Sequence, residues 1–165
     1  MKLKIGRILV PLDGSVLAES AIATAAEMGR PGLATLVLVR AAEAHTFPGA
    51  DPTDAQVEVV REAETYLAGV AERLKRQGLN KVETSVWYGP AAAAIVDAAR
   101  ARKADMIVMT THGRGGLGRL ILGSVAESVL RGTATPILLL RASEAPVQPP
   151  EGAGQARPAQ GASSG

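Results

Sequence analysis

The sequence contains no cysteine, and this absence removes several kinds of chemistry at once. Disulfide bonds, thiolate nucleophiles, and zinc or iron–sulfur sites built on cysteine are all excluded. Only two histidines occur among the 165 residues, and they lie far apart, at positions 45 and 112. A metal site that depends on histidine is therefore not expected either.

Aromatic side chains are also scarce, since one Trp, two Tyr and one Phe make up 2% of the chain. Proteins that bind single-stranded nucleic acid by base stacking need several aromatic faces. The net charge is only +2, with both signs scattered along the chain, so there is no large basic field for a nucleic acid to follow. We therefore expect no nucleic-acid partner, and a core built from Val, Leu, Ile and Ala.

Long hydrophobic runs are missing as well. No uncharged stretch reaches the ~18 apolar residues of a membrane-spanning helix, and the longest one, residues 84–96, contains Gly89 and Pro90. The apolar run near the N-terminus ends at Asp13 and is too short for a secretory signal with a cleavage site. We therefore expect a cytoplasmic protein without a membrane span.

The composition changes near the end of the chain. Residues 144–165 hold four of the ten prolines and a single aliphatic residue, Val147. Such a segment buries too little apolar surface to offset the entropy lost on ordering. We expect one folded domain over residues 1–143, followed by a disordered tail over residues 144–165.

Within the domain, apolar runs alternate with amphipathic segments. Strands are predicted at Ile5–Pro11, Ala34–Ala41, Val82–Tyr88, Asp105–Thr111 and Pro136–Arg141. Helices are predicted from Ser15 to Met28, from Asp54 to Gln77, after Gly89-Pro90, and from Ser124 to Gly132; the inner face of the long one is expected to carry Val57, Val60, Leu67, Val70 and Leu74. Continuous apolar strands separated by helices are typical of a parallel sheet covered on both faces. The predicted fold is an open, doubly wound α/β sheet.

The segment after the fourth predicted strand has the composition of a phosphate site. It carries Gly113, Gly115, Gly116, Gly118 and Gly123 and then leads into the last helix. Ser124 is expected to cap that helix in a capping box with Glu127. Ligands of open parallel sheets bind beyond the carboxyl ends of the strands, and a helix N-terminus offers free N–H groups to an anion. The sequence therefore predicts a polyphosphate site at this edge of the sheet.

Three common phosphate-related motifs do not fit. The G-x-G-x-x-G match at residues 113–118 has no acidic residue ~20 positions further on, as dinucleotide-binding folds require. The P-loop pattern fails because Arg119-Leu120 stand where Lys and Ser or Thr are needed. A phospho-receiver site needs paired acids after the first strand, where Asp13 stands alone.

A family resemblance follows from the spacing of these residues. Gly113, nine intervening residues and then Gly123-Ser124 resemble the ATP-binding signature of the universal stress protein family. The opening ILVPLDGS at Ile8–Ser15, the Gly89-Pro90 pair and the ending at Thr135–Leu139 are similar too, so the likeness covers residues 5–141. The family pattern, G-x-x-G-x9-G-[ST], begins with a glycine where this chain has Thr110. Because a β-branched residue resists positive φ, we expect either a backbone there that differs from the family's or a slightly altered pocket.

The resemblance implies the strand order 3-2-1-4-5 and binding of ATP, or of AMP or another adenine nucleotide, together with Mg²⁺. Asp13 would lie near the nucleotide-bound Mg²⁺, while the backbone of Ala41 and the side chain of Met109 would contact adenine. The nucleotide-binding residues implied in this way are Pro11, Leu12, Asp13, Ala41, Met109, His112, Gly113, Arg114, Gly123, Ser124, Val125 and Ala126.

The resemblance also implies a homodimer through the fifth strand, Pro136–Arg141, whose bare apolar edge invites pairing. No general base is poised for efficient hydrolysis, so we expect a stress-response regulator or signalling protein with at most slow ATP turnover, rather than an enzyme. Two alternatives stay open. One is a dimeric interaction module without nucleotide, in which Thr110 closes the pocket, and the other is a regulator that binds AMP or a cyclic nucleotide.

Overall fold

The computed structural model describes residues 4–29, 33–45, 48–49, 51–111 and 122–141. The tail expected over residues 144–165 lies outside these ranges. The strands are β1 (Arg7–Pro11), β2 (Thr35–Ala42), β3 (Val82–Tyr88), β4 (Met106–Thr110) and β5 (Ile137–Leu140). The helices are α1 (Val16–Glu19), α2 (Ala21–Met28), α3 (Pro52–Arg76), α4 (Ala91–Ala101) and α5 (Ser124–Gly132).

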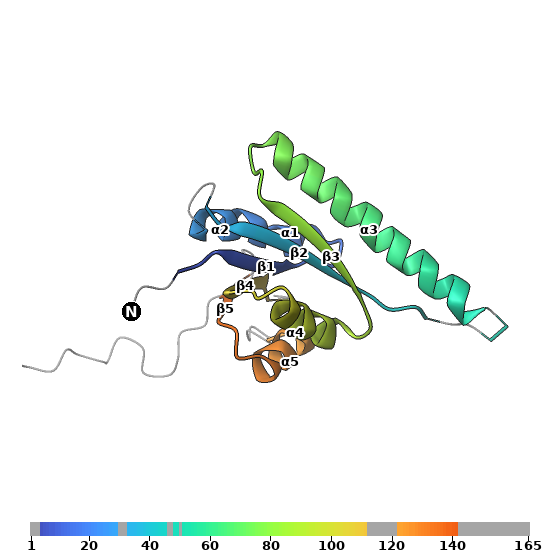
Figure 1. Cartoon of the computed structure of the whole chain (residues 1–165). Coiled ribbons are helices and arrows are strands. Elements are labelled where there is room, and N and C mark those ends of the chain that lie inside the picture. Colours follow the sequence, from blue (N-terminus) through green and yellow to red (C-terminus); the bar gives the residue numbers. More distant parts are fainter. Residues whose placement is uncertain (1–3, 30–32, 46–47, 50, 112–121, 142–165) are drawn as a thin grey trace, which may run out of the picture.

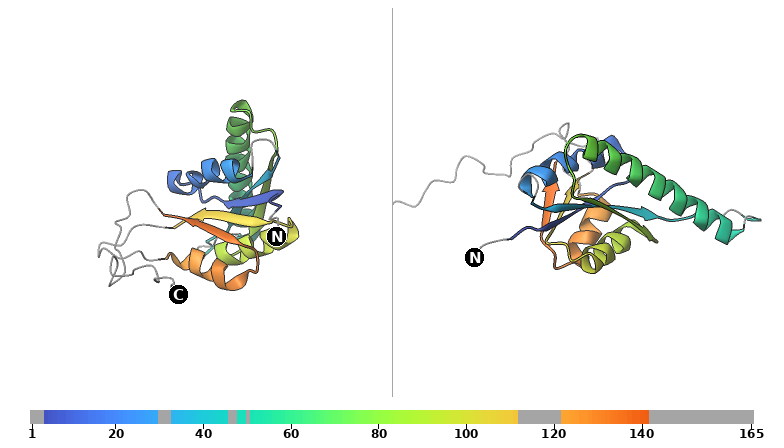
Figure 2. Two further views of the ribbon diagram at one scale, coloured as in Figure 1. Left: turned by 90° about the vertical axis from the view of Figure 1, so that its left-hand side faces the viewer. Right: turned by 45° about the horizontal axis from the view of Figure 1, so that its top comes forward.

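All five strands form one parallel sheet in the order β3-β2-β1-β4-β5. Helices α1, α2 and α3 cover one face and α4 and α5 the other (Figures 1 and 2). The middle strands read as apolar runs because they are covered on both faces; Leu9 and Ile107, paired in register, are fully buried. The predicted open α/β fold and its strand order are confirmed. None of the helices in the described ranges is long and apolar enough to span a membrane.

The helix predicted from Ser15 to Met28 is divided in two at Ser20, the residue between α1 and α2. The hydroxyl of Ser20 donates to the carbonyl of Leu17 at 2.6 Å. Ser15 caps α1 as predicted, because its side chain accepts a hydrogen bond from the N–H of Ala18 at 3.1 Å. This cap fixes the direction in which the chain leaves β1.

The first turns of α3 depart from the prediction. Val57 was expected on the inner face of the helix, but it is 51% exposed. The N-terminal half of α3 projects beyond the ends of the strands, as Figure 1 shows, so it has no sheet to cover there. Further along the helix, Leu67, Val70 and Leu74 are buried against the sheet as predicted.

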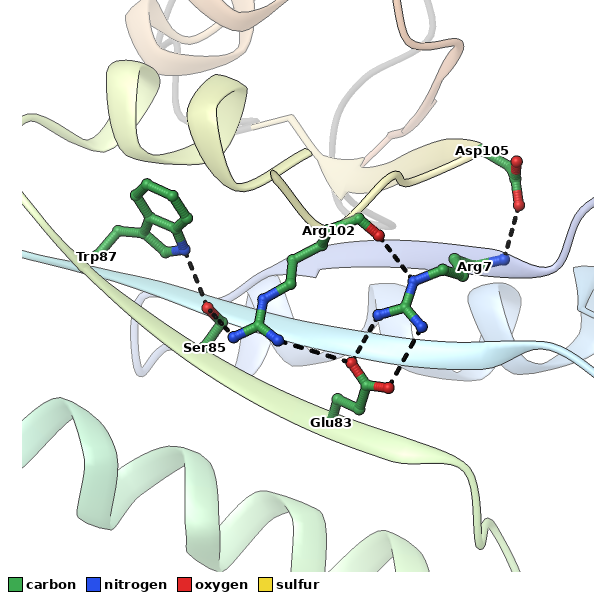
Figure 3. A network of polar contacts seen from close by, with 6 residues as sticks. All are labelled: Arg7, Glu83, Ser85, Trp87, Arg102 and Asp105. Atoms are coloured by element: carbon green, nitrogen blue, oxygen red, sulfur yellow. Dashed lines mark hydrogen bonds and ion pairs between the residues drawn. The ribbon is translucent and has the colours of Figure 1, made fainter. Parts of the chain in front are cut away.

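A polar network links the outer strand β3 to the centre of the sheet across β2 (Figure 3). The guanidinium of Arg7 on β1 pairs with Glu83 on β3 through Nη2 and Oε2, which lie 2.6 Å apart. Arg7 Nε also donates to the carbonyl of Arg102, at 2.7 Å. The side chain of Arg102 donates in turn to Ser85 Oγ at 3.0 Å, and Trp87 Nε1 donates to the same oxygen at 2.9 Å.

This network predicts how stability depends on pH. The hydrogen bond from Arg7, and then the charges of Arg7 and Arg102, hold the pKa of Glu83 below its ordinary value. Stability from a lowered carboxylate pKa is full above the unfolded-state pKa and is lost as pH falls through the folded-state pKa. Glu83→Gln is therefore expected to lower the free energy of unfolding at pH 7 by about 1 kcal/mol, allowing for solvent screening of this half-exposed pair.

Urea unfolding at pH 7 and at pH 3.5 measures the effect, and the gap between wild type and Glu83→Gln should shrink at the lower pH. Glu72→Gln is the matched control, because Glu72 makes only an exposed pair with Lys75 on α3 at 3.3 Å. An equal loss at both pH values would contradict the role given to the Glu83 charge.

Candidate functional site

A cavity of about 510 Å³ opens at the carboxyl ends of the strands. In the sheet order, β2 lies on one side of β1 and β4 on the other, so the strand order reverses direction at β1. The cavity lies at this switch point, where open α/β sheets bind ligands. Its volume is in the range of ordinary small-molecule pockets. The lining residues are Pro11, Leu12, Asp13, Ala18, Val39, Arg40, Ala41, Ala91, Ile95, Met109, Thr110, Gly123, Ser124, Val125 and Ala126.

The structure brings together nine of the twelve residues implied by the resemblance. Those that line the cavity are Pro11, Leu12, Asp13, Ala41, Met109, Gly123, Ser124, Val125 and Ala126. The other three, His112, Gly113 and Arg114, lie outside the described residues. Segments more than a hundred positions apart in the chain therefore meet at one place.

One wall of the cavity is apolar. It is formed by side chains on β2, α4 and β4, among them Val39, Ile95 and Met109, which also belong to the core on that face of the sheet. Flat apolar walls of this kind suit an aromatic ring, with backbone groups supplying the polar contacts.

The backbone of Ala41 faces the same space. The carbonyl of Val39 accepts from Leu12 N–H at 2.8 Å, and that of Ala42 accepts from Gly89 N–H at 2.9 Å on the opposite side. Because backbone direction alternates along a strand, Ala41 turns its carbonyl to the side of β1, beyond the point where β1 has ended. This places a hydrogen-bonding group at the edge of the apolar wall.

The opposite wall is the N-terminus of α5. Gly123, with φ −59° and ψ 149°, is the N-cap residue, and its carbonyl accepts from the N–H of Glu127 at 3.0 Å. The N–H groups of Ser124, Val125 and Ala126 fall in the first helical turn, where no intrahelical acceptor exists. Since all three residues line the cavity, the positive end of the α5 dipole opens onto it.

The capping box predicted at Ser124 is wrong. Ser124 is the first helical residue, one position beyond the cap, because the carbonyl of Gly123 already closes the first turn. The carboxylate of Glu127 pairs with Arg131 one turn ahead, at 2.8 Å, and there is no side-chain cap at this helix end. The Ser124 hydroxyl is thus left on the cavity wall with no capping role.

Asp13 occupies the loop that follows β1. Its Oδ1 accepts from the N–H of Ser15 at 2.9 Å, and the intervening Gly14 has φ +88°, a conformation that favours glycine. Asp13 is exposed and lines the cavity. The residue therefore shapes the turn and presents a carboxylate to the cavity at the same time.

Thr110, which stands where the family pattern has glycine, does not take a positive φ, as expected of a β-branched residue. Thr110 is the last residue of β4, pairs in register with Leu140, and is buried. Among the described residues, Lys103 is the only one besides glycines with a positive φ. A β-branched side chain suits an extended strand, and the Thr110 hydroxyl makes a long hydrogen bond of 3.4 Å to the carbonyl of Leu17. The cavity stays open beside it.

Five residues of the lining were not predicted from the sequence, namely Ala18, Val39, Arg40, Ala91 and Ile95, whereas Thr110 was expected beside the pocket from the family pattern. Val39 and Arg40 carry a usable signal, since they lie near the carboxyl end of a central strand. Ala91 and Ile95 carry none, because only the packing of α4 on β2 brings them to the cavity.

The described ranges contain no cluster of three or more His, Asp or Glu side chains that could hold a metal ion. Arg40 and Asp13 are the ionisable residues among the described lining. A divalent cation in this cavity would therefore need ligands from a bound molecule in addition to Asp13.

The sequence and the structure were compared with known proteins. The model of the universal stress protein family matches residues 4–141. The chain is 31% identical over 140 residues to universal stress protein MJ0531 of Methanocaldococcus jannaschii, which covers 82% of this chain and 81% of that protein. A crystal structure from the universal stress protein family of Burkholderia pseudomallei is 30% identical, covers 84% of this chain and 98% of its own, and superposes with a TM-score of 0.67.

Two more distant solved structures share the fold and contain nucleotides. One is a universal stress protein in complex with cAMP, 23% identical, covering 83% of this chain and 97% of its own, with a TM-score of 0.64. The other is a family member from Arabidopsis thaliana with AMP bound, 12% identical, covering 84% of this chain and 93% of its own, with a TM-score of 0.60.

Proposed function

Because the chain belongs to the universal stress protein family, we propose that it binds an adenine nucleotide in the cavity at the carboxyl ends of β1, β2 and β4. The observation that carries this proposal is the cavity itself, with an apolar wall on one side and the N-terminus of α5 on the other. An aromatic base fits the first wall and an anionic phosphate group fits the second.

ATP with Mg²⁺ is the ligand we propose. The first turn of α5 offers several N–H groups in a row, at Ser124, Val125 and Ala126, which suits a chain of phosphates. Asp13 lines the same cavity and would contribute to a Mg²⁺ ion that the phosphates also coordinate.

A second candidate is a mononucleotide such as AMP or cAMP. It is favoured by the two distant structures of the same fold, which contain these ligands. Such a ligand would use the apolar wall in the same way but would occupy fewer of the N–H groups on α5.

We propose that the protein acts through binding rather than through catalysis. Among the described residues that line the cavity, Asp13 is the sole carboxylate, and it is already engaged with the N–H of Ser15. Efficient attack by water on a phosphate needs a positioned base. Slow or no turnover of ATP fits a regulator whose nucleotide state is read by other molecules.

Mass spectrometry of the nucleotide released on denaturing the purified protein tests the proposal. Calorimetric titration with Mg-ATP, AMP and cAMP then ranks the ligands on the same preparation. Release or tight binding of ATP supports the main proposal, whereas preference for AMP or cAMP supports the second candidate. A protein that releases no adenine nucleotide and binds none in titration would overturn both.

Asp13→Asn is expected to lower the affinity for Mg-ATP about tenfold, the effect of losing one charged metal contact. An asparagine Oδ1 can still accept from the N–H of Ser15 and so preserves the turn. The affinity for ATP in EDTA should stay within about twofold, since removal of a negative charge does not weaken a phosphate contact. Titrations with and without Mg²⁺ measure both values.

Asp54→Asn on the exposed first turn of α3 serves as the control for the Asp13 variant, because Asp54 lies outside the cavity. Equal losses with and without Mg²⁺ would show that Asp13 only shapes the loop.

We also propose that two copies pair through β5. This strand is at the edge of the sheet, next to β4 alone, and all four of its residues are half-buried in the single chain. Antiparallel pairing of two β5 strands about a two-fold axis would satisfy the open backbone groups of both edges.

A further inference from the structure

Arg40 brings to the cavity a positive charge that the resemblance does not imply. It lies near the end of β2 and is one of the residues that line the cavity. Its guanidinium carbon lies 4.8 Å from the centre of the Tyr66 ring on α3. Both Nη atoms lie 3.7 Å from the position that a Cβ on Gly14 would take. The guanidinium is therefore held between α3 and the loop that follows β1.

This guanidinium forms no salt bridge within the described part of the chain, although the charge of Asp13 in the adjoining loop acts on the same Tyr66 ring. Within the described part of the chain, Arg7 pairs with Glu83 and Arg73 with Glu19, whereas Arg40 contacts the Tyr66 ring instead of a carboxylate. A partly buried charge without a partner is unfavourable. An anion that enters the cavity would supply the missing partner.

The Tyr66 ring is itself fixed in place. Its hydroxyl donates to Glu19 Oε1 at 2.7 Å, and Glu19 also pairs with Arg73. Burial, and then the hydrogen bond to Glu19, raise the pKa of Tyr66 far above its ordinary value, so the phenol stays neutral. A neutral aromatic face stabilises a cation above it and limits the orientations that the guanidinium can adopt.

We propose that Arg40 forms an anion-binding position of the cavity, separate from the N-terminus of α5, where it contacts a phosphate group of the bound nucleotide. This inference rests on the proposed function. A guanidinium presents two parallel N–H donors to phosphate oxygens, which makes it well suited to the contact. Tyr66 is the positioning residue that holds it.

The test compares Arg40→Gln with wild type by calorimetric titration against adenosine, AMP, ATP and inorganic tripolyphosphate. The variant is expected to lose about tenfold in affinity for ATP and for tripolyphosphate, the usual effect of removing a charged hydrogen bond. Its affinity for adenosine should not change. A lower affinity for AMP would place the Arg40 contact at the first phosphate, and an unchanged affinity for AMP would place it at a later one. Arg61→Gln, on the exposed side of α3, is the matched control.

Two Tyr66 variants separate the role of its ring from that of its hydroxyl. Tyr66→Phe keeps the aromatic face and should bind ATP within about twofold of wild type, whereas Tyr66→Leu should lose about threefold to fivefold. Thermal unfolding of both variants shows whether either change is only a loss of stability. An ATP affinity that is the same in Tyr66→Leu as in wild type would overturn the positioning role.

If wild type and Arg40→Gln bind ATP equally well, the Arg40 contact is overturned and the nucleotide site stands. If wild type binds no adenine compound, the proposed function is overturned, and tripolyphosphate decides the inference by itself. If wild type binds tripolyphosphate and Arg40→Gln binds it more weakly, the anion-binding position is supported. If both bind it equally well, or wild type does not bind it, the position is overturned.

Discussion

Gly123→Val is expected to lower the affinity for the adenine nucleotide about a hundredfold while the fold survives. The added side chain would stand beside the N–H groups of α5, where phosphate oxygens must approach. Loss of two charge-assisted hydrogen bonds of about 1.5 kcal/mol each corresponds to this factor. Titration with Mg-ATP measures the affinity, and circular dichroism with thermal unfolding measures the fold.

The fold should survive because Gly123 has φ −59° and ψ 149°, a conformation open to every residue. Valine is a poorer N-cap than glycine, so a loss of about 1 kcal/mol in stability is expected. Ser128→Val adds a β-branched residue to the exposed side of the same helix and should leave ATP binding unchanged. Undiminished binding by Gly123→Val would place the phosphates elsewhere.

If two copies pair through β5 as proposed, Leu139→Pro is expected to convert the dimer into monomers. The carbonyls of Pro136 and Leu140 accept hydrogen bonds from the N–H groups of Ile107 and Thr111, at 2.9 Å each. Because backbone direction alternates along a strand, the N–H of Leu139 points away from β4, toward the open edge. Proline removes this donor and places its ring where a second strand would pair, and it is tolerated on edge strands.

Sedimentation equilibrium over a range of protein concentrations measures the change. Leu139→Ala is the matched control, since it removes the same apolar contacts with the core on the side of α4 and α5 but keeps the N–H. The alanine variant should stay dimeric and should lose only folding stability. Lysine at Leu138 would be a poorer probe, because that side chain packs against the core on the other face. A wild-type protein that sediments as a monomer at high micromolar concentration would overturn the pairing.

Alternation of apolar runs and amphipathic segments was enough to predict the fold class. Strand β3 begins and ends where the sequence places it, at Val82 and Tyr88, and α5 begins at Ser124 as expected. Nearby sequence determines these boundaries, because they depend on the period of the apolar residues and on the flanking glycines and prolines. Fully apolar strands signal burial on both faces before any packing is known.

The location of the site was also accessible from the sequence, because the carboxyl ends of parallel strands meet at one edge of the sheet. The nine predicted residues that line the cavity come from the ends of β1, β2 and β4 and from the start of α5. Their positions along the chain, together with a parallel sheet, determine that they come close together.

The tertiary structure alone decided which groups complete the cavity. Ile95 reaches it because α4 packs on β2, and Arg40 becomes significant only because Tyr66, 26 positions along the chain, lies beneath its guanidinium. Thr110 is extended because it is the last residue of β4 and pairs in register with Leu140 of β5. Val57 is exposed because α3 is longer than the strands it covers. Each of these outcomes depends on how two segments distant in sequence are placed against each other in the fold. A periodic pattern within one segment carries no information about that placement.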